Sequence, residues 1–211
     1  MIFAALGDVN GNLRAVEAAL SDLDEAGILT IVQTGNVAGA PGGDGAARLL
    51  RERGVTVARG LRDRQAARFQ RSAALLRRKL GEAEWESIRR AHQGLSREIL
   101  EWFARLPHAV MVSIDGFTIV VCHGAPSGVS RVLDQATPEE RLRREREAAP
   151  ADVIVCGGSE TPFSRMVDGT LFVGPGPLGP RPGEACYTVV DLETRPWRAR
   201  PRVIPVPAAV Q

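Results

Sequence analysis

The sequence contains little lysine, few aromatic residues and no long hydrophobic run. Lys79 is the only lysine among 27 basic residues, which indicates a compositional bias toward arginine. The formal net charge is only +2, because the arginines are interspersed with Asp and Glu. Nucleic-acid-binding proteins carry a concentrated basic surface. We therefore expect no nucleic-acid partner.

Cysteine is also scarce, and it is not spaced as in a metal or redox site. Cys122, Cys156 and Cys186 are far apart and lack a C-x-x-C pair, an arrangement that favours a reducing compartment. Cys122 and Cys156 end apolar strands, so we expect them to be buried packing residues. The N-terminal apolar stretch of about five residues has no basic flank and is too short for a signal peptide or a membrane span. These absences predict a cytoplasmic protein with no membrane partner.

The length and composition suit one domain. With 211 residues, of which 44% are hydrophobic and 25% charged, the chain can bury a sizeable core without disulfides or a structural metal. We expect a single domain over residues 1–211.

Strand and helix patterns alternate in the first part of the chain. Apolar residues 1–6 end at Gly7-Asp8, as a buried strand that enters a turn does. Asn12 is the expected N-cap of a helix that ends near Gly27. Further strands are expected over residues 28–32 and 55–58, with a helix over 46–53 between them. This alternation predicts a parallel α/β core.

The rest of the chain begins with a helical segment and continues with strands. Residues 63–107 have apolar residues at helical spacing and no strand pattern, so we expect two or three helices inserted between strands. Asp115-Gly116 predicts a hairpin, and two more β segments meet at Asp168-Gly169. The other expected elements are strands over 109–114, 117–122, 153–156, 185–191 and 198–206, and a charged helix over 139–148; the last strand is a proline-rich edge strand or tail.

Short glycine-containing turns follow four of the predicted strands, at residues 7–12, 35–36, 60–63 and 122–124. In open α/β sheets the loops at the carboxyl ends of the strands form the ligand crevice. We therefore expect these turns to converge on one site.

The turns resemble the motifs of the calcineurin-like metallophosphoesterases, which run in the order G-D-x-H-G-N, G-D, G-N-H-D/E, H-G and G-H-x-H. The matching segments are, in the same order, GDVNGN at 7–12, TGN at 34–36, RGLRD at 59–63, CHG at 122–124 and CGGSETPF at 156–163. Each motif alone is a weak signal, but five in the family's order at predicted strand ends are specific.

Two further segments, GPGPLG at 174–179 and LEWFARLPHAV at 100–110, extend the resemblance over nearly the whole chain. The resemblance implies a four-layer α/β/β/α sandwich of two mixed β-sheets. It also places the helical insert at 63–107 beside the crevice. The family's reaction is metal-assisted hydrolysis of phosphomonoesters or phosphodiesters.

The resemblance also shows which of the family's metal ligands this sequence keeps. The first Asp and one later His remain, as Asp8 and His123. The replaced positions are Asn10 for a His, Asn36 for the Asp that bridges the two metals, Leu61 for an Asn, and Gly158 and Glu160 for the last two His residues. Glu160 is the one replacement whose side chain can still ligate a metal as an anion.

These replacements remove charge where two cations need it. Two dications about 4 Å apart repel by on the order of 17 kcal/mol at an effective dielectric constant of 20, so a bridging anion is required. Asn36 supplies no charge, and Leu61 and Gly158 supply no donor atom. We therefore expect no intact dinuclear site. The remaining oxygen ligands, Asp8, Asn10, Asn36 and Glu160, suit either no metal or one weakly bound Mg²⁺, Mn²⁺ or Ca²⁺.

Arg62 falls on the position of the family's G-N-H-D histidine. Arg62 and His123 are the candidate catalytic residues. A guanidinium is a poor proton donor near neutral pH but a good bidentate partner for phosphate. The candidate phosphate-binding residues are Arg62, Arg59, Asn36 and His123. The plainer interpretations are a solvated surface arginine and a hydrogen-bonded core histidine.

Three functions remain open from the sequence. The first is a divergent homologue with impaired or lost hydrolase activity that binds a phosphate-containing small molecule. The second is an active phosphoesterase that uses one divalent metal. The third is a structural or interaction protein that acts through the helical insert, whose apolar residues also suit a homo-oligomer interface.

Overall fold

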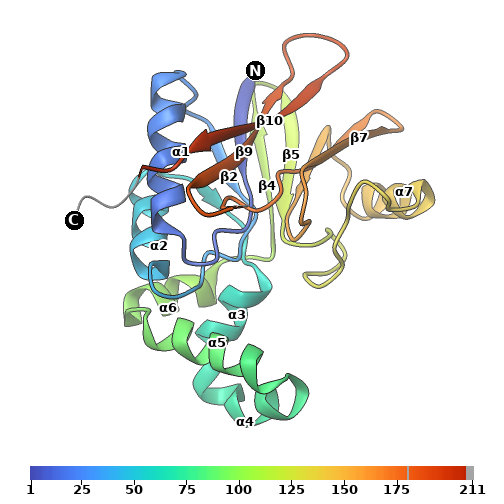
Figure 1. The fold of residues 1–211 in the computed structure, drawn as a ribbon. Helices are drawn as coiled ribbons and strands as arrows, with labels where there is room; N and C mark the ends of the chain where they lie inside the picture. The colour runs from blue at the N-terminus through green and yellow to red at the C-terminus, as the bar shows by residue number, and fades with distance from the viewer. Residues whose placement is uncertain (180, 208–211) are drawn as a thin grey trace.

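The computed structural model describes residues 1–179 and 181–207 and contains two five-stranded mixed sheets (Figure 1). The first sheet has the order β10 (Arg198–Pro205), β9 (Glu184–Asp191), β1 (Ile2–Leu6), β2 (Ile31–Gln33) and β3 (Thr56–Val57). The second has the order β4 (Ala109–Ile114), β5 (Phe117–Cys122), β6 (Val153–Cys156), β8 (Thr170–Gly174) and β7 (Phe163–Val167). In each sheet three neighbouring strands run parallel, and the remaining pairings are antiparallel.

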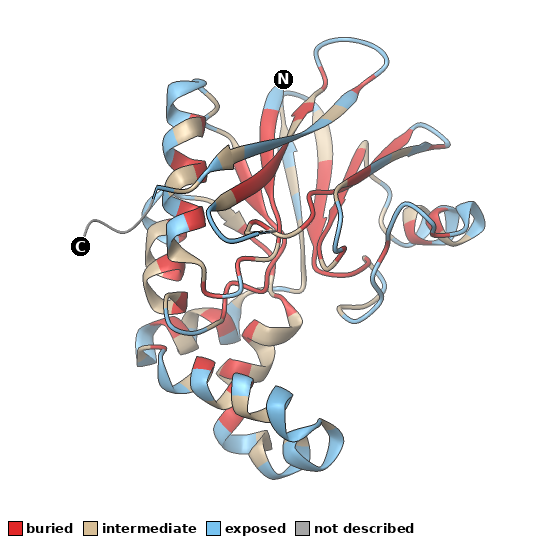
Figure 2. Cartoon of the chain, viewed as in Figure 1, coloured by how far each residue is buried: buried red, intermediate tan, exposed pale blue. Residues whose placement is uncertain are grey.

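Three apolar clusters divide the fold into layers. Along β1, Ala4 and Leu6 face the helices α1 (Leu13–Glu25) and α2 (Gly43–Glu52), whereas Phe3 and Ala5 face the second sheet. This alternation follows from the two-residue period of a strand. The helix α7 (Glu139–Ala148) covers the other face of the second sheet through Leu142. The predicted four-layer α/β/β/α sandwich is therefore confirmed, with its buried residues on the inner strands and helix faces (Figure 2).

The helical insert contains four helices, so the expected number of two or three was wrong. They are α3 (Leu61–Ala67), α4 (Phe69–Lys79), α5 (Glu82–Gln93) and α6 (Arg97–Arg105), between β3 and β4. The missed break lies at Arg68, where no glycine or proline marks it. Helix α6 joins the core through Ile99 and Phe103, whereas Phe69 is the only buried residue of α4. The insert thus projects from one end of the sandwich (Figures 1 and 2).

Local predictions of turns and caps are confirmed. The Asn12 side chain accepts a hydrogen bond from the Ala15 N–H at 3.1 Å and caps α1. Asp115 and Gly116 both have positive φ, 49° and 81°, as a two-residue hairpin turn requires. The proline-containing β10 is an edge strand, where a residue without an N–H is tolerated. No helix in the described ranges is both long and apolar enough to span a bilayer.

Candidate functional site

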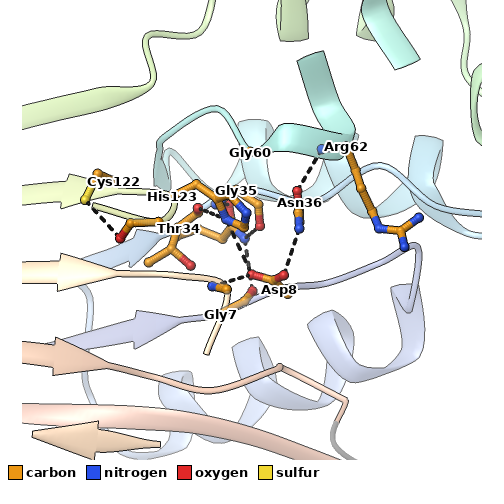
Figure 3. A network of polar contacts seen from close by, with 12 residues as sticks. Gly7, Asp8, Thr34, Gly35, Asn36, Gly60, Arg62, Cys122 and His123 are labelled. Atoms are coloured by element: carbon orange, nitrogen blue, oxygen red, sulfur yellow. Dashed lines mark hydrogen bonds and ion pairs between the residues drawn. The ribbon is translucent and has the colours of Figure 1, made fainter. Parts of the chain in front are cut away.

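The turns that follow β1, β2, β3, β5 and β6 meet at one end of the two sheets (Figure 3). The N–H groups of Val9 and Asn10 both donate to the Asn36 carbonyl, at 3.1 and 2.8 Å. The backbones approach so closely that a Cβ at Gly60 would lie 2.0 Å from the Asn36 nitrogen. A Cβ at Gly157 would lie 2.5 Å from the Thr34 Oγ1. The predicted convergence is confirmed, and it depends on glycine at these contacts.

Asp8 lies at the centre of this region, and protein donors surround its carboxylate. The Asn36 Nδ2 donates to Oδ2 at 2.8 Å, and the Gly158 N–H donates to Oδ1 at 3.2 Å. The His123 Nδ1 lies 3.6 Å from Oδ1, beyond ordinary hydrogen-bond length. Both carboxylate oxygens therefore have a neutral N–H donor from the protein (Figure 3).

The orientation of the Asn36 amide follows from its second partner. Its Oδ1 accepts a hydrogen bond from the Arg62 backbone N–H at 2.9 Å. A backbone N–H can only donate, so the oxygen of the amide must face Arg62 and the nitrogen must face Asp8. Asn36 is 8% exposed and has a φ of 55°, in the left-handed region that Asn tolerates better than most residues. The amide therefore directs an N–H group at the Asp8 carboxylate.

Asp63 fixes the backbone of the turns around the centre by hydrogen bonds. It is fully buried, and its carboxylate accepts backbone N–H bonds from Asn36 at 2.9 Å, Gly60 at 2.8 Å and Ala38 at 2.7 Å. Burial raises the pKa of Asp63, and the backbone hydrogen bonds act in the opposite direction. Asp63 was not among the predicted site residues. Its position as the acidic residue that ends RGLRD was the available signal.

His123 is 4% exposed and is oriented by the strand end beside it. Its Nδ1 lies 3.1 Å from the Thr34 carbonyl oxygen, which can only accept, so Nδ1 carries a proton. Nε2 is then the acceptor of the neutral ring. A Cβ at Gly158 would lie 3.8 Å from Nε2, so a longer side chain at position 158 would reach the same space. Position 158 contributes only its backbone N–H.

The other predicted site residues lie outside this hydrogen-bonded group. Asn10 and Glu160 are exposed. The Arg62 guanidinium extends away from Asp8, and its Nη1 lies 3.4 Å from the Ser87 Oγ on α5 (Figure 3). The Arg59 Nη1 donates to the Ala104 carbonyl at 2.9 Å. The structure thus brings Asp8, Asn36 and His123 together, while a metal-binding role for Asn10 and Glu160 stays a prediction.

The donor set does not fit a pair of divalent cations. Asp8 is the one carboxylate at the centre that is not buried beneath it, and Asn36 presents a nitrogen where an anionic oxygen is needed. Within residues 1–179 and 181–207, no three His, Cys, Asp or Glu side chains are grouped to hold a metal ion.

Comparison with known proteins identifies the family. The model of the calcineurin-like phosphoesterase superfamily domain matches residues 1–195. A hypothetical protein from Pyrococcus horikoshii OT3 has a TM-score of 0.79 at 21% identity, with 97% of this chain and 87% of that chain covered. A metallophosphoesterase from Sphaerobacter thermophilus has a TM-score of 0.74 at 19% identity, with coverages of 98% and 90%.

A more distant likeness is Vps29 complexed with Zn²⁺ from Entamoeba histolytica, with a TM-score of 0.54, 14% identity and coverages of 98% and 100%. At these identities the structural matches establish the fold alone. The comparison with curated proteins found no match. Since the family model spans nearly the whole sequence, the chain belongs to the calcineurin-like phosphoesterase superfamily.

Proposed function

We propose that this protein is a calcineurin-like phosphoesterase homologue in which hydrogen bonds replace the dinuclear metal centre. It binds a phosphate-containing small molecule and has little or no hydrolase activity. The observation that carries the proposal is the 2.8 Å bond from the Asn36 Nδ2 to the Asp8 Oδ2. An amide N–H directed at this position repels a cation, whereas the family's bridging carboxylate would attract two.

Turning the Asn36 amide to offer its oxygen would not restore the centre. The turn would break the bonds to Asp8 and to the Arg62 N–H, at about 1 kcal/mol or more for each. The amide oxygen would still be neutral, so the repulsion of about 17 kcal/mol between two dications would remain without a bridging anion. A two-metal mechanism is therefore disfavoured by charge as well as by hydrogen bonding.

Binding of phosphate is favoured at the side of the crevice that carries arginine. Without metals, the Asp8 carboxylate repels an anion at the centre itself. Arg62 lies in the first turn of α3, beside this centre, with a partly exposed side chain. A guanidinium there can bind a phosphate group by bidentate hydrogen bonds.

Metal analysis combined with a hydrolysis assay tests the proposal. Metal-free protein is incubated with excess Mn²⁺, passed through a desalting column and assayed on bis-p-nitrophenyl phosphate. We expect substoichiometric metal, and hydrolysis no faster than that of the matched Asp8→Ala variant. Stoichiometric metal together with hydrolysis that Asp8→Ala abolishes would instead establish the single-metal phosphoesterase. Absence of both metal and phosphate binding would favour an interaction protein that works through the insert.

Two broader expectations belong to the same proposal. We propose that residues 1–211 act as one domain with the insert as part of it, because α6 shares the apolar cluster of α1 and α2. We also propose a cytoplasmic location, because the three cysteines are free and buried. Burial raises the pKa of Cys156 to about 12, so its thiol is inert under ordinary conditions.

A further inference from the structure

Positive charge is concentrated in the segment that follows β3. Five arginines lie between residues 59 and 71, and Asp63 is the only acidic residue among them. Asp63 is fully buried, and backbone N–H groups occupy its carboxylate. In the described ranges Asp63 forms no ion pair with these arginines, and its charge offsets that of Arg59 only in part. The arginines of the segment are Arg59, Arg62, Arg64, Arg68 and Arg71.

Two of these arginines line a cavity of about 340 Å³. The other lining residues are His108, which follows the insert, and Gly128 and Val129, which follow β5. The cavity thus lies between segments that extend from the same strand ends as the Asp8 centre. The segment after β5 packs closely against Gly124 at this wall. A Cβ at Gly124 would lie 2.7 Å from the Val129 carbonyl oxygen.

The polar groups of this cavity lack partners of opposite charge. In the described part of the chain, no carboxylate lies within ion-pair distance of Arg64 or Arg59. Burial lowers the pKa of Arg59, and the neighbouring charges of Arg68 and Arg64 act in the same direction, whereas the charge of Asp63 opposes them. The His108 Nε2 is buried and has no hydrogen-bond partner among the described residues.

We propose that the cavity lined by Arg59, Arg64 and His108 is an anion site that binds the phosphate dianion of a small molecule. The inference rests on the phosphate binding of the proposed function and places the phosphate group in this cavity rather than at Arg62, but it does not depend on the state of the Asp8 centre. Two guanidinium groups supply charge and forked N–H donors, and the His108 side chain forms part of the wall. A dianion would relieve the repulsion between the arginines.

The three histidines of the chain allow the site to be identified directly. His123 lies at the Asp8 centre, His108 lines the proposed site, and His92 lines a separate groove on the insert. Inorganic phosphate is titrated into the full chain while the imidazole ¹H–¹³C resonances are recorded. We expect the His108 resonances to shift saturably and those of His92 and His123 to stay in place. Saturable shifts of His123 alone would overturn the inference and leave the phosphate binding of the proposed function intact.

The phosphate affinities of single-residue variants test the same site. Arg64→Gln is expected to weaken phosphate binding about tenfold in calorimetry, because a charge-assisted hydrogen bond is lost, and His108→Gln about threefold. The matched control is Arg200→Gln, which removes an exposed arginine from β10 and should leave the affinity unchanged. Equal affinities of Arg64→Gln and the unsubstituted protein, or loss in Arg62→Gln alone, would overturn the inference.

A parallel titration with adenosine monophosphate distinguishes the source of the phosphate. Tighter binding than that of inorganic phosphate, with the same His108 shifts, would identify a phosphomonoester as the ligand class. Equal affinity would identify the free ion. Failure of both probes to shift the His108 resonances, with binding still detected by calorimetry, would overturn the inference alone. Absence of binding in calorimetry would overturn it together with the phosphate-binding part of the proposed function, whereas the metal analysis tests the Asp8 centre separately.

Discussion

The Asp8 centre and the Arg59–His108 cavity lie at the same strand ends but differ in how their polar groups are satisfied. At the centre, both oxygens of Asp8 accept N–H bonds, and the amide of Asn36 uses its nitrogen and its oxygen. In the cavity, Arg64 has no carboxylate partner in the described ranges, and the His108 Nε2 has no partner there either.

This difference indicates where a ligand gains most from binding. Buried polar groups in folded proteins are nearly always paired, so a group left without a partner is a candidate for contact with a ligand. At the centre, a ligand must displace hydrogen bonds that the protein already makes. In the cavity, an anion adds hydrogen bonds and neutralises charge without displacing a carboxylate. The family's motif positions and the best anion site are therefore neighbouring but separate.

The largest expected difference in the free energy of unfolding is between variants of two adjacent residues on α3. Asp63→Ala leaves three buried backbone N–H groups without an acceptor and should lower the free energy of unfolding by about 4 kcal/mol. Arg64→Ala, one residue later, should change it by less than about 0.5 kcal/mol. Urea denaturation measures both. Similar losses in the two variants would show that the cavity is as tightly integrated as the centre.

Asn36→Asp tests the proposal that the hydrogen bond to Asp8 disfavours metal binding at the centre. Two facing carboxylates should lower the free energy of unfolding by about 2 kcal/mol at neutral pH. Repulsion raises the folded-state pKa of one carboxyl above its unfolded value, so stability is greatest below that unfolded pKa, near 3.9, and is lost as pH rises through the folded pKa.

Urea denaturation of Asn36→Asp at acidic and neutral pH, with and without Mn²⁺, checks this expectation. Mn²⁺ should restore part of the lost stability only in this variant, because only it has a paired carboxylate. Asn36→Ala is the control, since it removes the bond to Asp8 without adding charge. A variant as stable as the parent at neutral pH without metal would contradict the role assigned to this bond.

The smallest expected change in the free energy of unfolding is for a variant at the cavity. Arg64→Gln should raise the free energy of unfolding by about 0.4 kcal/mol at low salt, because it removes one of several mutually repelling charges. The gain should vanish near ~1 M salt, where exposed charges are screened. Thermal or urea denaturation at the two salt concentrations measures it, with Arg200→Gln as the control. A destabilised Arg64→Gln would show that Arg64 has a structural role.

Local structure was predictable where short-range rules govern it. The hairpin at Asp115-Gly116 and the cap at Asn12 depend on the backbone freedom or side chain of one or two residues, and both were predicted correctly. The boundary at Arg68 was missed, because no glycine or proline marks it. Phe69, which follows it, packs against Trp85 and His92 of α5, a contact between residues distant in sequence.

The proximity of the strand-end residues was more predictable than the directions of their side chains. The motif series predicted that Asp8, Asn36 and His123 lie together, and they do. It did not indicate that the Arg62 guanidinium extends toward Ser87, or that the Asp63 carboxylate binds the backbone of the Asn36 turn. Side-chain direction depends on neighbours from other strands, and these neighbours are distant in sequence.

The sequence by itself indicated the family and the layered α/β architecture, because strand-end motifs and residue types are local properties. Only the tertiary structure decided which way the Asn36 amide faces, since that depends on the Arg62 N–H from a different turn. It likewise brought Arg59, Arg64 and His108 around one cavity, from segments more than 40 residues apart. Hydrogen bonds and uncompensated charges between distant segments exist only once the chain has folded.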